Sequence, residues 1–149
     1  MATSITAADL TVTITESVTL AGSDRGSTHT LTISDVTEVD SRIVTVDTTG
    51  AEIIGFGSAN SKGTFVRTDV KYIRLTNKDD TNYVIIGMSK SGADTFYIKL
   101  EAGKSIMFGN DDLEVDASGG AYSAFVEADS IQAKANGAAC DLEYFVALT

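Results

Sequence analysis

The feature that most constrains this chain is the alternation of apolar and polar residues in short runs. In the first run, Leu10, Val12 and Ile14 alternate with threonines at positions 11, 13 and 15. A period of two places successive side chains on opposite faces of a β-strand, so this run predicts a strand with one face buried. Only one stretch, 122–129, has weak helical character. The pattern predicts an all-β fold with less than about a tenth of its residues in helix.

About ten strands are expected, separated by Gly, Asn, Asp and Ser at the spacing typical of a β-sandwich, here a jelly-roll-like one. They are predicted at 10–20, 28–33, 42–47, 52–56, 70–76, 83–88, 95–100, 105–108, 130–134 and 142–148. The threonines are spread over many of these strands and are interpreted as ordinary solvent-face residues that follow no motif.

Turn residues and apolar patterning predict how some of these strands are arranged. One hairpin is expected between 83–88 and 95–100, and a second between 95–100 and 105–108 through the Ala102-Gly103 turn. The segment 70–75 has apolar residues at both alternating sets of positions, which predicts a central strand covered on both sides.

The chain is predicted to form a single domain over 1–149. A chain of this length can bury a sizeable core without disulfides or metals. Residues 1–9 precede the first full strand pattern and are expected to form an N-terminal arm, while the acidic region 109–129 is the longest loop. Both segments are expected to contact other chains.

Net charge limits the partners of the chain. The formal net charge of −10 argues against nucleic acid, since phosphate backbones are bound by clustered Lys and Arg. No basic leader and no apolar run of about 20 residues is present, which predicts a soluble protein made in the cytoplasm without a membrane partner. The chain also has no proline, a residue that blocks exposed sheet edges, so its edges favour pairing with neighbouring subunits.

Candidate residues for chemistry are few. His29 is the single histidine and shares an alternating face with Leu31 and Ile33, so a packed or interface role is expected rather than catalysis. Cys140 is the single cysteine and is interpreted as a small buried hydrophobe. No catalytic, cofactor-binding or metal-ligating residue is therefore predicted, and the chain is not expected to be an enzyme.

Two acidic segments and the tyrosines leave ligand binding as an alternative. The segments 77–82 and 110–114 offer oxygen ligands but do not follow EF-hand spacing, so plain turns are favoured and calcium remains an alternative. The chain has five tyrosines and no tryptophan. These tyrosines are expected at strand and core-edge positions, and a glycan- or receptor-binding module is kept as an alternative function.

Three parts of the second half of the chain together show a characteristic succession of strands and turns. Residues 70–87 run from a strand through Thr76-Asn77, an acidic turn and Asn82 into a second strand, and 96–105 end in Leu-Glu-Ala-Gly-Lys-Ser. The segments 131–135 and 141–146 add a closing pair of strands. This succession of strands and turns resembles that of small β-sandwich virion proteins of tailed phages, especially marine ones. The resemblance covers roughly the last 80 residues and implies no particular site residue.

The resemblance implies a structural part of a virion. An acidic chain poor in helix and with unblocked sheet edges fits a decoration or cement protein that stabilises the capsid exterior. The expected partners are the major capsid protein or other virion proteins, together with further copies of the chain in a homo-oligomer such as a trimer. A tail-tube, head-tail adaptor or fibre-attachment subunit is the alternative within the same particle.

Overall fold

The computed structural model describes residues 4–90, 95–116, 119–120, 122 and 128–149. Within these residues there are thirteen strands and no helix. The all-β prediction is therefore confirmed for the described part of the chain. Most of the stretch 122–129, which has weak helical character in the sequence, lies outside the described residues.

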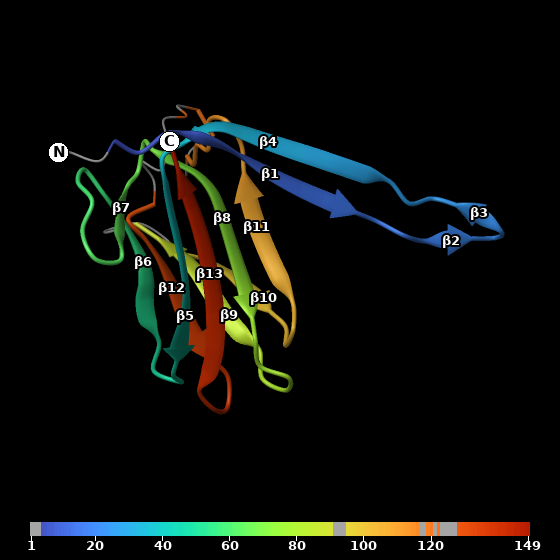
Figure 1. Ribbon diagram of the computed structural model, residues 1–149. Helices are drawn as coiled ribbons and strands as arrows, with labels where there is room; N and C mark the ends of the chain where they lie inside the picture. Colours follow the sequence, from blue (N-terminus) through green and yellow to red (C-terminus); the bar gives the residue numbers. More distant parts are fainter. Residues whose placement is uncertain (1–3, 91–94, 117–118, 121, 123–127) are drawn as a thin grey trace.

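Two stacked sheets form the body of the molecule (Figure 1). The five-stranded sheet has the order β10 (Phe96–Leu100), β9 (Val84–Ser89), β12 (Ser130–Ala135), β6 (Ala51–Gly57) and β7 (Thr64–Val66). The four-stranded sheet has the order β11 (Ser105–Gly109), β8 (Val70–Asn77), β13 (Cys140–Leu148) and β5 (Glu38–Val46). The body is sandwich-like, whereas the jelly-roll topology stays a prediction.

Apolar side chains from both sheets fill the space between them. Ile54 and Ile131 of the five-stranded sheet belong to the same buried cluster as Leu75 and Leu142 of the four-stranded sheet. Cys140 is also a buried member of this cluster, which confirms its interpretation as a small hydrophobe, and burial raises the pKa of its thiol.

Every predicted strand has a counterpart in the structure, but three elements differ from the prediction. The segment expected as one strand at 10–20 is divided into β1 (Ala8–Thr15) and β2 (Thr19–Leu20). The short strands β3 (Ser23–Asp24) and β7 were not predicted, because two or three residues are too few to show an alternating pattern.

One of the two predicted hairpins is correct. Strands β9 and β10 pair antiparallel, as expected. The second prediction, a hairpin of 95–100 with 105–108, is wrong because β11 pairs with β8 in the opposite sheet. The Ala102-Gly103 turn therefore carries the chain from one sheet to the other. A turn sequence specifies a reversal, but it does not specify in which sheet the next strand pairs.

Strand β8 is covered on both of its faces, as its sequence predicts. Ile73 and Leu75 point into the sandwich core, whereas Tyr72 lies on the outer face in a second buried cluster. This second cluster joins β1 and β4 (Thr28–Val36) to the sandwich; its members are Ile33, Val36, Tyr72 and Ala147, with Leu10, Val12, Leu31 and Phe145 partly buried around them. The tyrosine ring and Phe145 meet edge to face at 6.0 Å.

A glycine makes this contact possible. A Cβ atom added at Gly109, the last residue of β11, would lie 2.8 Å from Leu31 Cδ2 and 2.8 Å from Tyr72 Cδ2. Both distances are shorter than a carbon–carbon contact allows. Only a residue without a side chain lets Leu31 reach the ring of Tyr72 here.

We expect Gly109→Ala to lower the free energy of unfolding by about 1–3 kcal/mol, because the added methyl group overpacks this junction. A urea titration followed by circular dichroism measures the change. Lys104→Ala, at an exposed position just before the same strand, is the matched control and should change stability little. Equal midpoints for the two variants would contradict the close packing described for Gly109.

Candidate functional site

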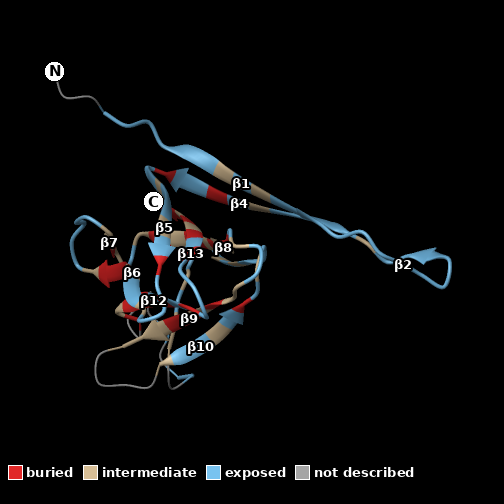
Figure 2. Cartoon of the chain, turned by 90° about the horizontal axis from the view of Figure 1, so that it is seen from below, coloured by how far each residue is buried: buried red, intermediate tan, exposed pale blue. Residues whose placement is uncertain are grey.

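Residues 8–36 form a two-stranded ribbon, here called the arm, that leaves the sandwich and ends far from it (Figures 1 and 2). One register runs along its length, from Leu10 opposite Ile33 to Leu20 opposite Ser23. Backbone hydrogen bonds keep this register between the strand pairs, as shown by the Glu16 N–H donating to the Ser27 carbonyl at 2.8 Å. The arm is therefore one continuous hairpin.

The tip of the arm is a two-residue turn. Ala21 and Gly22 connect β2 to β3 with φ values of 50° and 80°. Positive φ at both central residues is the signature of a type I′ turn, whose twist matches that of a β-ribbon. The sequence supplies glycine at the second position, where positive φ has little steric cost.

The base of the arm contains a β-bulge. Ala8 pairs with Val36 but Leu10 pairs with Ile33, so β4 carries one more residue than β1 at this point. Asp35 lies within the bulge and has a φ of 60°, a left-handed conformation that Asp adopts more readily than most residues. Bulges bend a ribbon, and this one lies where the arm meets the sandwich.

The two faces of the arm differ in chemistry. On one face three threonine pairs lie in register, namely Thr11 with Thr32, Thr13 with Thr30 and Thr15 with Thr28. All six threonines are exposed. Cross-strand pairs of β-branched residues stabilise and stiffen a ribbon. The interpretation of these threonines as solvent-face strand residues is confirmed, whereas their pairing in register was not predicted; two Thr-x-Thr-x-Thr runs flanking a turn were the available signal.

The opposite face of the arm is apolar and covered in its inner half, whereas its exposed outer half combines apolar and polar side chains. Leu10, Val12, Leu31 and Ile33 pack on the sandwich through the second cluster. Farther out, three apolar side chains of the same alternating set are exposed, namely Ile14 (39%), Val18 (43%) and Leu20 (61%). The exposed Glu16 lies between Ile14 and Val18 in this set and accepts a hydrogen bond from the Ser27 hydroxyl, and Arg25 lies opposite Val18. We call this outer part the distal apolar face. Figure 2 shows the distal arm as exposed along its length.

His29 lies on the distal apolar face. It pairs with Ile14 and is exposed. The expected face is confirmed, because His29 alternates with Leu31 and Ile33 on β4, but a packed role within the chain is wrong. The interface role stays a prediction.

A second exposed apolar surface lies on β5. Because Val39 pairs with Ala147 and Ile43 pairs with Glu143, both side chains share the outer face of the four-stranded sheet. Val39 is 50% and Ile43 62% exposed. We call this surface, formed by Val39, Ser41, Ile43 and Thr45, the β5 face. It lies on the same sheet that supports the base of the arm.

Charged groups lie along one side of the β5 face, on and beyond β13. Arg74 Nη2 donates to Glu143 Oε1, and Lys78 Nζ lies 3.6 Å from Glu143 Oε2. The hydrogen bond from Arg74 holds the pKa of the Glu143 carboxyl below its usual 4.5. Asp141 accepts a hydrogen bond from the Thr45 hydroxyl at 2.9 Å. The exposed Val39 and Ile43 of the β5 face are thus bordered on the β13 side by the Glu143 ion pairs and by the Asp141 carboxylate.

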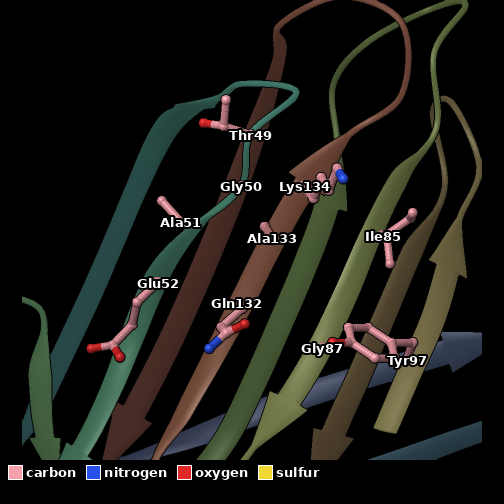
Figure 3. Close-up of a pocket in the computed structure, with 10 residues that line it drawn as sticks. All are labelled: Thr49, Gly50, Ala51, Glu52, Ile85, Gly87, Tyr97, Gln132, Ala133 and Lys134. Carbon is pink, nitrogen blue, oxygen red and sulfur yellow. The ribbon is translucent and has the colours of Figure 1, made fainter. Parts of the chain in front are cut away.

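A shallow groove of about 640 Å³ lies on the outer face of the other sheet. Its floor contains one row across four strands, in which Tyr97, Gly87, Gln132 and Glu52 pair in succession. Figure 3 shows the Tyr97 ring beside Gly87, where an added Cβ would lie 3.0 Å from Tyr97 Cε1. Tyr97 is 62% exposed, and Gln132 and Glu52 are exposed in the same row, although Figure 3 shows the Glu52 carboxylate directed away from the other two side chains.

The acidic segments form hydrogen-bonded turns. Asp79 Oδ1 accepts hydrogen bonds from the Thr81 and Asn82 amides, and the latter bond is the main reason that the pKa of Asp79 is lowered. In the second segment, Asp112 lies 3.7 Å from Lys71 Nζ. Among the described residues, no three His, Cys, Asp or Glu side chains are grouped so that they could hold a metal ion.

The remaining sequence expectations concern segments near the ends and the long loop. Ser4 to Ala7 are exposed and carry no strand, whereas Ala8 and Asp9, expected in the N-terminal arm, already belong to β1. The region 109–129 has no strand after Gly109 in its described part, and 117–118, 121 and 123–127 lie outside the described residues. In the described chain no helix is long and apolar enough to cross a membrane.

Comparison of the chain with protein-family models, with curated proteins and with solved structures finds no match.

We expect Glu143→Gln to destabilise the fold at neutral pH, because it removes the carboxylate that Arg74 and Lys78 hold. The folded-state pKa is lowered, so the contribution of the carboxylate is present above about pH 4.5 and is lost as the pH falls through the folded-state value. Urea midpoints at pH 7 and pH 3 measure this. The two proteins should differ at pH 7 and converge at pH 3.

The control is Glu101→Gln, which removes a carboxylate from the more exposed ion pair with Lys99. Exposed pairs contribute little, so its midpoint at pH 7 should be close to that of the unmodified chain. A Glu143→Gln deficit that persists at pH 3 would instead assign the loss to packing.

Proposed function

We propose that this chain is a non-enzymatic structural protein of a tailed-phage virion, acting as a decoration or cement protein on the capsid exterior. Its partners are the major capsid protein or other virion proteins, together with further copies of itself in a homo-oligomer such as a trimer. It would be made in the host cytoplasm and carried in the virion. The resemblance of 70–87, 96–105, 131–135 and 141–146 to small phage virion proteins supports this proposal. The observation that carries it is the exposed arm.

The arm supports an assembly role for a physical reason. An isolated two-stranded ribbon is at most marginally stable in water. The distal arm has two unpaired edges and an apolar face exposed to solvent, both of which are features that other chains can cover. Strands rise about 3.3 Å per residue, so the arm reaches about 20 Å from Ile14 to Leu20. The distal arm therefore extends well beyond the sandwich that carries it.

The charge of the chain supports an external position in the particle. Ten net negative charges disfavour contact with packaged nucleic acid, which needs clustered basic residues. A protein of this kind acts by burying surface across subunit joints, where a standard contact covers roughly 1,600 Å². No bond-making chemistry is required for that role.

Copy number separates a decoration protein from the alternative of a tail-tube, head-tail adaptor or fibre-attachment subunit. A decoration protein repeats over the capsid, whereas a connector ring contains few copies. Quantitative mass spectrometry of purified particles should therefore find this chain in numbers comparable to the major capsid protein. A ratio typical of a single ring would instead assign the chain to the tail or connector.

We expect a shortened arm to lose attachment to particles while the sandwich stays folded. In this variant Asn-Gly replaces residues 16–27 and joins Thr15 to Thr28, which already face each other across the ribbon. Co-sedimentation with particles that lack the protein measures attachment, and circular dichroism measures folding. Ala21→Asn, which keeps the full arm and improves its turn, is the control. Equal attachment of the two variants would remove the distal arm from the mechanism.

A glycan-binding module is the second candidate, favoured by the groove in Figure 3. Its row combines an exposed aromatic ring, Tyr97, with the amide of Gln132 and the carboxylate of Glu52. Sugars stack their apolar faces on aromatic rings and use planar polar groups for hydrogen bonds.

A glycan array probed with the unmodified chain tests this candidate. Binding should be lost in Tyr97→Ala and kept in Phe96→Ala, which removes a neighbouring aromatic side chain of similar exposure, 64% against 62%. An array without a positive signal, or equal loss in both variants, would contradict glycan recognition by the groove.

A further inference from the structure

We propose that the distal apolar face of the arm docks on the β5 face of a second copy of this chain. The inference rests on the assembly role proposed above and names one partner for it. It joins Ile14, Val18 and Leu20 of one copy to Val39 and Ile43 of the next.

A contact within the chain, between the base of the arm and the four-stranded sheet, supports a second copy as the partner. The apolar face of the arm begins at Leu10 and Ile33, which pack on the outer face of the four-stranded sheet within the chain. The same face continues without a change of register to Leu20, where no sandwich lies beneath it. The outer face of a four-stranded sheet is thus a surface that this arm already fits in its inner half.

The second copy offers the part of that sheet which its own arm leaves uncovered. The base of the arm covers Tyr72 and Ala147, whereas Val39 and Ile43 on the neighbouring strand are exposed. Because Val39 pairs directly with Ala147, the β5 face borders the surface that the arm covers. A docked arm would therefore extend an apolar contact that the sheet already makes.

The two surfaces belong to one chain but lie apart within it. Figures 1 and 2 both show the tip of the arm far from β5 and pointing away from the sandwich. An exposed apolar surface that cannot reach its counterpart within the chain can reach it in another copy. A contact between two different surfaces is heterologous, and it generates a closed ring or an open chain of subunits.

Charge distribution agrees with this pairing. Arg25 is the only Lys or Arg between residues 8 and 36, and its amide bonds to the Val18 carbonyl, which places it opposite Val18 on the ribbon. The carboxylate of Asp141 lies beside the β5 face, held by Thr45. Both surfaces therefore carry groups of both signs, Arg25 and Glu16 on the arm and Asp141 and Lys78 beside the β5 face, so opposite charges can meet in one defined register.

Two double variants test the proposal in the full-length chain. Ile14→Thr with Val18→Thr removes apolar surface from the arm while keeping β-branched residues, and Val39→Thr with Ile43→Thr does the same on the β5 face. Sedimentation velocity over a concentration series measures association. The unmodified chain should form oligomers, and each double variant should raise the dissociation constant by about tenfold or more.

Mixing the two double variants gives the sharper result. The β5-face variant keeps an intact arm, and the arm variant keeps an intact β5 face. The intact arm of the first can therefore dock on the intact β5 face of the second. The two remaining surfaces are both substituted, so no third chain can be added. The mixture should therefore form a complex of two chains and nothing larger. Thr13→Ser with Thr15→Ser, on the opposite face of the same strand, is the control for the arm, and Phe96→Ser is the control for loss of an exposed apolar group elsewhere. Both controls should associate like the unmodified chain.

Each outcome has a definite meaning. A monomeric unmodified chain, unaltered association of either double variant, or a mixture that stays monomeric would overturn the proposed contact. A monomeric chain that still attaches to particles would leave the decoration role in place and remove only this contact. Oligomers that depend on both surfaces but do not attach to particles would keep the contact and contradict the decoration role.

Discussion

The packing of the arm on Tyr72 is the contact on which the rest of the structure depends. Strand β8 faces the sandwich core on one side, and on the other side its tyrosine is buried by the base of the arm. Complete burial of one apolar side chain such as Ile33 contributes about 1.5–3 kcal/mol. This cluster fixes a ribbon that would be marginal alone, and it fixes the ribbon to the middle of a sheet. The arm therefore starts from a rigid support.

What the arm can do follows from its two unlike faces. The threonine pairs need no partner, since hydroxyl groups are solvated by water, whereas an apolar surface is stabilised when other groups cover it. Along the ribbon the covered half and the exposed half of the apolar face share one register. The sandwich thus covers and stabilises the inner half of the arm, and the outer half stays exposed to other molecules.

Alternation in the sequence predicted most strands but not their partners. The run that begins at Leu10 and the run that ends at Ile33 were both recognised as half-buried strands, and both are. Periodicity does not reveal that they pair with each other outside the sandwich, because a buried face looks the same whichever surface covers it. The groove beside Tyr97 could not be predicted either, since its four residues come from four strands that meet only in the folded sheet.

The short link between the arm and the sandwich has a mechanical consequence. Only Thr37 separates β4 from β5, and its amide donates to the Leu148 carbonyl. Figure 1 shows the arm running crosswise to the strands of the sheet, so tension along the arm would pull at one end of β5 instead of along its length. Hydrogen bonds loaded in that direction break one after another rather than together. The apolar base of the arm precedes β5 in the chain, so it would bear the load before β5 does. The strength of this apolar contact therefore limits the force that a neighbouring molecule can exert before β5 separates from β13.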